Sequence, residues 1–266
     1  MTLDIPHSFA LGVLQGLTEF LPVSSSAHLA LFPRFFGWTD PGLAFDVALH
    51  LGTLAGVVAY FRKELWRFVE GLLHFNDSAY EQERRTVLFL LLATVPGALA
   101  GFLFEQKVET VFRNPKLIAI VLIVMGVALG FMDRFFAGQK RITDLSVTTA
   151  VGVGMAQALA LMPGVSRSGI TITVALALGF AREEAAHFSF LLSIPIIAGA
   201  GIFKSRELWL SPEKGPLVVG FLGAAVAGLA AIAILMRYVQ KHRYTPFILY
   251  RWALGTFVLL NLSRFL

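Results

Sequence analysis

Apolar runs of bilayer length recur along the whole of this 266-residue chain. About 20 consecutive apolar residues are needed for a helix to cross the hydrocarbon core of a membrane. Runs of this kind predict full crossings at about 43–61, 87–104, 117–132, 188–203, 217–236 and 246–263. With 56% hydrophobic and only 15% charged residues, the composition excludes a soluble domain. The sequence therefore predicts an all-α polytopic membrane protein that forms a single integral membrane domain.

The formal charge of +5 does not indicate a nucleic-acid partner. Basic residues gather between the predicted crossings, as they do in the cytoplasmic loops of membrane proteins. The chain has no cysteine, which excludes disulfides, thiolate metal sites and a cysteine nucleophile. No basic stretch precedes a short apolar core at the start of the sequence, so we expect no removable signal peptide.

Three pairs of segments resemble each other, in the same order, along the two halves of the chain. The pairs are 15–28 with 157–169, 46–65 with 183–208, and 113–135 with 243–265. We interpret them as two repeats, roughly 1–140 and 141–266, with three of the predicted crossings in each. Three crossings reverse the direction of the chain. The second repeat is therefore expected to be inverted, provided that the remaining segment of each repeat enters and leaves on one side.

That remaining segment, 7–37 or 146–180, is interrupted in each repeat by a proline and a serine-rich turn. Pro22 and Pro163 would each divide their segment into two half-helices, because a proline disfavours helical geometry at the residue before it. Broken helices at membrane depth are tolerated only where protein or a water-filled cavity covers them. Each repeat is thus predicted to be a broken re-entrant helical hairpin plus three transmembrane helices, with a binding site near the middle of the membrane.

Lysine and arginine counts predict the orientation of the chain. The loops 62–86, 133–144, 181–187 and 237–245 hold more of these residues than the loops on the opposite side, 12 against 8. An excess of basic residues marks the cytoplasmic side. The first broken hairpin is therefore expected to open outward and the second inward, so that the two meet near the middle of the membrane.

The first hairpin carries the sequence LTEFLPVSSSAHLAL at residues 17–31. Gln15 and Glu19 are four residues apart and therefore share one face of the first half-helix. The serines at 24–26 suit the start of the second half-helix, as caps or as exposed hydroxyls. His28 follows within about one turn.

The second hairpin reads LMPGVSRSGITIT, in which Ser166 can cap the second half-helix and Arg167 stands beside Ser168 and Thr171. A helix N-terminus with free N–H groups is an anion site, and an arginine adds a planar fork that fits phosphate oxygens. A charged side chain at mid-membrane costs about 2.5–3.5 kcal/mol on insertion scales, so Arg167 needs a partner or a function. A carboxylate, an imidazole, an arginine and several hydroxyls together suit phosphoryl transfer.

Purely structural roles also fit these residues. Intramembrane serines commonly bond backbone carbonyls, and Glu19 and Arg167 could form a purely structural ion pair. We interpret His50 and His187, each a few residues after an acid, as helix-cap or interface residues. Arg251 is expected to snorkel or to pair locally.

QGLTEFLPVSSSAH (15–28) resembles the glutamate-rich first motif of the undecaprenyl pyrophosphate phosphatase family, also called the bacitracin resistance protein family. PGVSRSGIT (163–171) resembles its second motif, and FSFLLSIP and PFILYR extend the resemblance over essentially the whole chain. The resemblance implies an integral hydrolase of the bacterial cytoplasmic membrane, with its active site on the outer, periplasmic face. It would remove the terminal phosphate from undecaprenyl pyrophosphate, return the C55 monophosphate to peptidoglycan synthesis, and confer bacitracin resistance.

The resemblance also implies a role for each matching residue. Glu19 would hold a water or a divalent cation, Mg²⁺ or Ca²⁺. Ser25 and His28 would be the nucleophile and its base, or His28 the nucleophile itself, while Arg167 would clamp the pyrophosphate. The substrate-binding residues lining the site would be Gln15, Ser24, Ser26, Ser166, Ser168 and Thr171.

Gln15 departs from the family pattern, because many members have glutamate there. The ion would then depend on Glu19, the pyrophosphate oxygens and water. A transporter or flippase of the lipid carrier is the competing hypothesis, since inverted repeats with broken helices are typical of transporters; the two activities could also be combined. The expected partners are the polyprenyl pyrophosphate lipid and the bilayer, with no nucleic acid; the sequence leaves the oligomeric state open, and a homodimer is compatible with it.

Overall fold

The computed structural model describes residues 4–39, 41–111 and 114–265. Within these ranges the regular structure is helical, apart from one isolated bridge between Lys140 and Phe180. Five of the described helices are long and apolar enough to span a membrane. They are α3 (Leu43–Leu73), α4 (Glu81–Val111), α5 (Pro115–Phe135), α8 (Arg182–Phe203) and α10 (Lys214–Val239). The prediction of an all-α polytopic membrane protein is confirmed.

The sixth predicted crossing, 246–263, is the shorter helix α11 (Thr245–Leu260). Its 16 residues extend about 24 Å at 1.5 Å per residue, less than the thickness of a typical hydrocarbon core. The helix ends at Leu260, where the backbone N–H of Asn261 donates to the carbonyls of Phe257 and Val258. A 3₁₀ turn, η4 (Leu262–Arg264), follows.

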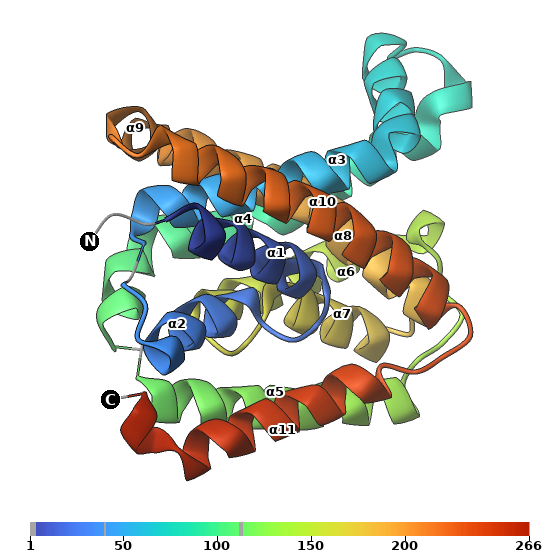
Figure 1. Ribbon diagram of the computed structural model, residues 1–266. Helices are drawn as coiled ribbons and strands as arrows, with labels where there is room; N and C mark the ends of the chain where they lie inside the picture. The colour runs from blue at the N-terminus through green and yellow to red at the C-terminus, as the bar shows by residue number, and fades with distance from the viewer. Residues whose placement is uncertain (1–3, 40, 112–113, 266) are drawn as a thin grey trace.

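Each predicted broken segment consists of two half-helices. The first is α1 (Ile5–Phe20) with α2 (Ser25–Phe36), and the second is α6 (Val147–Ala158), the 3₁₀ turn η3 (Leu159–Leu161) and α7 (Arg167–Ala177). Figure 1 shows that the two hairpins enter from opposite ends of the bundle: α1 starts and α2 ends at the end near both termini, and α6 and α7 belong to the other end. Their tips, where the helices break, lie between the long helices.

Equivalent helices of the two halves exchange partners. Helix α1 packs along α10 while α6 packs along α4, and α3 faces α8 while α5 faces α11. Glycines allow the two close approaches: a Cβ on Gly12 would lie 2.4 Å from the carbonyl oxygen of Gly220, and one on Gly154 would lie 2.6 Å from that of Ala93. This exchange is what two inverted repeats around a pseudo-two-fold axis produce. Arg113, which opens the segment 113–135, lies outside the described residues.

Helix α3 is much longer than the predicted crossing at 43–61, because it continues to Leu73. Its 31 residues extend about 46 Å, so its last turns and the start of α4 project beyond the bundle (Figure 1). An ion pair between Arg67 and Glu83 joins the two arms of this projection, and the 3₁₀ turn η1 (Ser78–Tyr80) connects them. The remaining short elements are η2 (Ile142–Asp144) and α9 (Ser205–Leu210).

Candidate functional site

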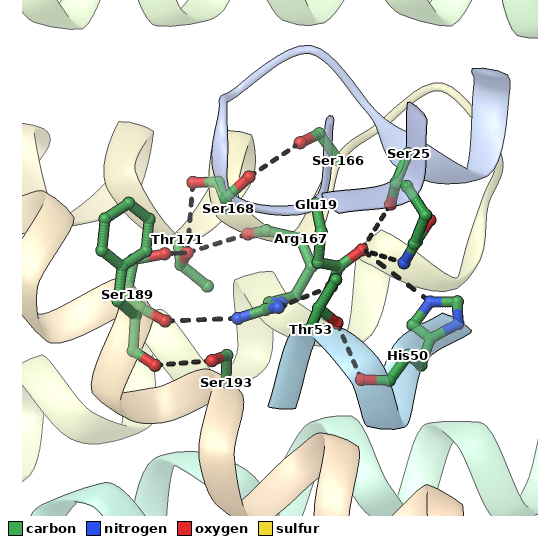
Figure 2. A network of polar contacts seen from close by, with 12 residues as sticks. Glu19, Ser25, His50, Thr53, Ser166, Arg167, Ser168, Thr171, Ser189 and Ser193 are labelled. Carbon is green, nitrogen blue, oxygen red and sulfur yellow. Dashed lines mark hydrogen bonds and ion pairs between the residues drawn. The ribbon is translucent and has the colours of Figure 1, made fainter. Parts of the chain in front are cut away.

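Glu19, on the last turn of α1, is the centre of a polar cluster between the two hairpin tips (Figure 2). Its Oε1 accepts a hydrogen bond of 2.7 Å from Nη2 of Arg167. Its Oε2 accepts one of 2.5 Å from the hydroxyl of Ser25 and one of 3.0 Å from Nε2 of Gln15. Four of the residues that the sequence predicts for the site are therefore in direct contact, although they come from both halves of the chain.

The backbone at the two breaks explains why Ser25 and Arg167 meet. They are the first residues of α2 and α7, and each follows a serine cap, Ser24 or Ser166, with a positive φ of 76° or 72°. A left-handed conformation is strained for a residue other than glycine, and such strain persists where the surroundings over-determine it. It turns the chain sharply, so that the first side chain of each helix points to the contact between the hairpins.

Most of the predicted hydroxyl residues hold the backbone of these turns. The Oγ atoms of Ser24 and Ser26 are 3.2 Å apart, as are those of Ser166 and Ser168. Ser24 also accepts the N–H of Gly164 at 3.2 Å, which ties one hairpin tip to the other. For these four serines the structure gives a local structural role, and their contact with substrate stays a prediction.

A second hydrogen bond holds the guanidinium of Arg167 on the side away from Glu19. Its Nη1 donates to the carbonyl of Ser189 on α8 at 3.3 Å. Thr171, one turn further along α7, donates to the carbonyl of Arg167 and lies 2.7 Å from the hydroxyl of Ser189. The guanidinium is therefore fixed between Glu19 and α8. Thr171 holds the backbone carbonyl of Arg167 and contacts the same residue of α8, Ser189.

The structure does not bring His28 into this cluster. His28 is fully buried, its Nδ1 donates to the carbonyl of Ser24 at 2.7 Å, and its Nε2 lies 2.7 Å from the hydroxyl of Tyr250 on α11. Both ring nitrogens thus have partners, and neither partner is Glu19 or Ser25. The role of His28 as base or nucleophile stays a prediction.

His50 on α3 is a residue that the sequence analysis did not assign to the site. Its Nε2 lies 3.8 Å from Oε2 of Glu19. The repeat pattern gave His50 and His187 the same interpretation, but His187 instead lies 2.8 Å from Glu64 and stacks on Phe61 at the contact of α8 with α3. The sequence has no signal that separates the two histidines, because only the tertiary packing puts Glu19 beside His50 and Glu64 beside His187.

The expectation that Arg251 snorkels or pairs locally is wrong. The residue is 1% exposed, and its guanidinium donates to the carbonyls of Pro22 at 3.1 Å, Gly164 at 2.6 Å and Val165 at 3.1 Å. A further bond of 3.1 Å reaches the carbonyl of Leu122 on α5. Each break leaves carbonyls without helical partners at membrane depth, where they must be satisfied internally. Arg251 satisfies those of both hairpins at once.

The side chains around Glu19 do not provide a set of ligands for a resident metal ion. Both carboxylate oxygens already accept hydrogen bonds, and the guanidinium of Arg167 lies 2.7 Å from one of them. No group of three His, Asp or Glu side chains that could hold a metal ion occurs among the described residues. The buried Oε1 of Gln15, which has no hydrogen-bond partner, is a single acceptor and does not complete a ligand set.

The chain matches the family model described as bacitracin resistance protein BacA over residues 8–257. It belongs to this family. Among the relatives of this chain is a protein of Moorella thermoacetica named undecaprenyl-diphosphatase, 46% identical over 96% of this chain and 97% of its own. Proteins with the same name from Elusimicrobium minutum and Geobacter sulfurreducens are 48% and 45% identical, over 96% and 97% of this chain and 97% and 98% of their own.

Proposed function

We propose that this BacA family chain hydrolyses undecaprenyl diphosphate to undecaprenyl phosphate and inorganic phosphate. Relatives named undecaprenyl-diphosphatase match it over nearly its full length. The observation that carries the proposal is the contact of Glu19 with both Ser25 and Arg167, since it joins an acceptor for a hydroxyl proton to an anion-binding guanidinium. Neither these contacts nor the names of the relatives give support to the transporter hypothesis.

Ser25 is the nucleophile in this proposal, because its hydroxyl already donates to Glu19 whereas both nitrogens of His28 have other partners. Its Oγ attacks the terminal phosphorus, the new Oγ–P bond forms, and the bond from phosphorus to the bridging oxygen breaks. Glu19 accepts the hydroxyl proton and delivers it to the departing lipid phosphate.

Water completes the turnover. Glu19 takes a proton from a water molecule whose oxygen attacks the phosphoserine, and the proton returns to Oγ as the Oγ–P bond breaks. Arg167 turns from Glu19 to the phosphoryl oxygens, where its planar fork stabilises the charge of the transition state. The N–H groups at the start of α2 and α7 add a favourable field for the anion.

The divalent cation predicted from the sequence, Mg²⁺ or Ca²⁺, does not fit as a resident ion, because the oxygens of Glu19 are already occupied. No step above depends on it. If turnover depends on such an ion, the pyrophosphate oxygens would have to hold it, and the dependence would be a property of the substrate complex.

We also propose that the protein lies in the bacterial cytoplasmic membrane with the tip of the projection, around Ser78, in the cytoplasm, so that the first hairpin opens to the periplasm. The excess of basic residues in that part of the chain supports this orientation. A cysteine at Ser78, in a chain that has no other, should resist a membrane-impermeant maleimide added to whole cells. A homodimer stays a prediction.

The decisive experiment measures phosphate release from C55 pyrophosphate by detergent-purified protein, with Mg²⁺ and with a chelator. Glu19→Gln should abolish release, because the amide cannot accept the proton of Ser25. Glu64→Gln is the matched control, since Glu64 pairs with His187 away from the cluster, and it should keep most of the activity. If the wild type binds the lipid but releases no phosphate, the hydrolase proposal fails and the transporter hypothesis gains support.

A further inference from the structure

His50 forms the accessible side of the Glu19 cluster, and the mechanism above gives it no part. Its Nε2 lies 3.8 Å from the same carboxylate oxygen that accepts the hydroxyl of Ser25. The side chain of His50 is 39% exposed, against 6% for Glu19 and 12% for Arg167. A ligand that approaches Ser25 from the open side therefore meets the imidazole of His50 before it reaches the buried groups.

The ring of His50 is held in one direction. Nδ1 lies 2.8 Å from the carbonyl of Asp46, and because a carbonyl only accepts, Nδ1 is the donor. This bond to the preceding turn of α3 directs the other nitrogen, Nε2, to the cluster (Figure 2). The hydroxyl of Thr53 donates to the carbonyl of His50 at 2.7 Å and supports the same stretch of helix. A side chain fixed in this way is suited to positioning a ligand at little cost in conformational entropy.

The charge of a diphosphate makes a donor at this position useful. Arg167, the strongest cation in the cluster, is bound to Glu19, and Gln15 and Ser25 also direct their donors at that carboxylate. An incoming phosphate must therefore find at least one donor that is not already used by Glu19 at short range. Among the cluster residues described, Nε2 of His50 is the nitrogen that stays at 3.8 Å, beyond hydrogen-bond distance, and faces the accessible side.

We propose that His50 is a substrate-binding residue that acts as an imidazolium, protonated on both ring nitrogens, and that its Nε2 donates a hydrogen bond to an oxygen of the lipid diphosphate. This inference rests on the proposed function, and it adds a phosphate contact from α3 to the two hairpins. His50 orients the terminal phosphate over Ser25 while Arg167 turns from Glu19 to the phosphoryl oxygens.

The second half of the chain provides a matched control. His187 occupies the equivalent position on α8, but its Nε2 is 2.8 Å from Glu64 and its ring stacks on Phe61 with centroids 5.2 Å apart. It is the same residue type in the same place of the other repeat, without a contact to Glu19. A substitution that acts only through the loss of a histidine at the contact of these helices should affect both positions alike.

The experiment compares purified His50→Leu, His50→Gln and His187→Leu with the wild type. KM and kcat are measured for C55 pyrophosphate, and Kd is measured for a prenyl methylenebisphosphonate, which cannot be hydrolysed. His50→Leu should raise KM and Kd about tenfold with a smaller change in kcat, since a hydrogen bond to a charged group is lost. His50→Gln should keep both constants within about threefold, because its amide nitrogen reaches the place of Nε2 and still donates. His187→Leu should leave both constants unchanged.

Unchanged KM and Kd in His50→Leu would overturn the inference. A glutamine variant as weak as the leucine variant, with both folded as judged by their melting temperatures, would overturn it too, because a donor would then not be what position 50 supplies. The bisphosphonate separates this inference from the proposed function. If the wild type releases no phosphate, the hydrolase proposal fails, yet the Kd series still decides whether His50 contacts the diphosphate.

Discussion

The two hairpins have similar backbone conformations at their tips and differ in the side chains that they place there. Both tips break at a serine with a positive φ, both place that serine's hydroxyl 3.2 Å from the hydroxyl of the serine two residues later, and both bury a glutamine whose Oε1 has no partner. The residue after the cap is Ser25 in the first hairpin and Arg167 in the second. Where the first hairpin has Glu19, the equivalent position of the second is Leu161.

This difference explains how a duplicated fold can hold an asymmetric site. The repeated turn brings two equivalent positions face to face, and different side chains there give a hydroxyl opposite a guanidinium. Two identical hairpins would place like groups together, either two hydroxyls or two cations that repel each other. One carboxylate, from one half only, then binds both partners. The two turns have the same cap residue and the same sign of φ, and the site is asymmetric because the residues that follow the caps differ.

Removing the hydroxyl from the first hairpin is expected to have the largest effect. Ser25→Ala should lower kcat for C55 pyrophosphate by at least about 10³-fold, because the proposed nucleophile is lost while Glu19 and Arg167 stay in contact. Single-turnover phosphate release measures this directly. Ser78→Ala, in the exposed 3₁₀ turn of the projection, is the control and should match the wild type. A Ser25→Ala enzyme with a tenth or more of the wild-type kcat would show that the nucleophile lies elsewhere, and His28 would be tested next.

Breaking the link between the two tips should have the next largest effect. Arg251→Met keeps much of the side-chain volume but removes every donor to the carbonyls of Pro22, Gly164 and Val165. We expect a loss of about 3 kcal/mol or more in stability, since buried polar groups are left unpaired, together with a loss of activity. Unfolding in mixed micelles measures the first effect.

The control for this change is Arg237→Met, at an exposed position near the end of α10, and it should unfold like the wild type. If Arg251→Met is as stable as the control, the carbonyls at the breaks are satisfied in another way, and the two tips do not depend on a shared arginine.

Much of the fold follows from the sequence because its determinants are local. Apolar runs give the long helices, and Pro22 and Pro163 locate both breaks to within a few residues. The length of α3 was missed because its last turns leave the apolar run: they carry charged residues from Arg62 onward, and an ion pair to α4 joins them to the next helix. The length of helix α11 was overestimated because apolar residues continue in the sequence past Asn261, where the helix ends.

The site is predictable only in part. Glu19, Ser25 and Arg167 are polar residues at membrane depth beside helix breaks, and that combination is visible in the sequence. The position of His50 depends on how α3 packs against α1, and Arg251 lies more than 80 residues from any of the tip carbonyls that it binds. Contacts of this kind leave no local signal in the sequence. An arginine in an apolar run has the same sequence context whether it snorkels or binds the carbonyls of two hairpins.

The smallest predicted effect is the difference in stability loss between alanine substitutions of the two cap serines. Ser166→Ala removes the acceptor for the N–H of Gly169, which should cost about 1 kcal/mol, as for other caps. Ser24→Ala removes the acceptor for Ala27 and also leaves the N–H of Gly164 unpaired at membrane depth, so we expect it to cost about 1 kcal/mol more. Unfolding of both variants under the same conditions gives the difference directly.

Ser146→Ala is the reference for an ordinary cap, because Ser146 caps α6 with an extended φ of −132° and accepts the N–H of Thr149. Glycine at either tip should be milder than alanine, since glycine adopts a positive φ without strain. Equal losses for Ser24→Ala and Ser166→Ala would mean that the contact from Gly164 to Ser24 contributes little. The two caps would then be equivalent, and the asymmetry of the two tips would reside in the side chains that differ between them, Ser25 against Arg167 and Glu19 against Leu161.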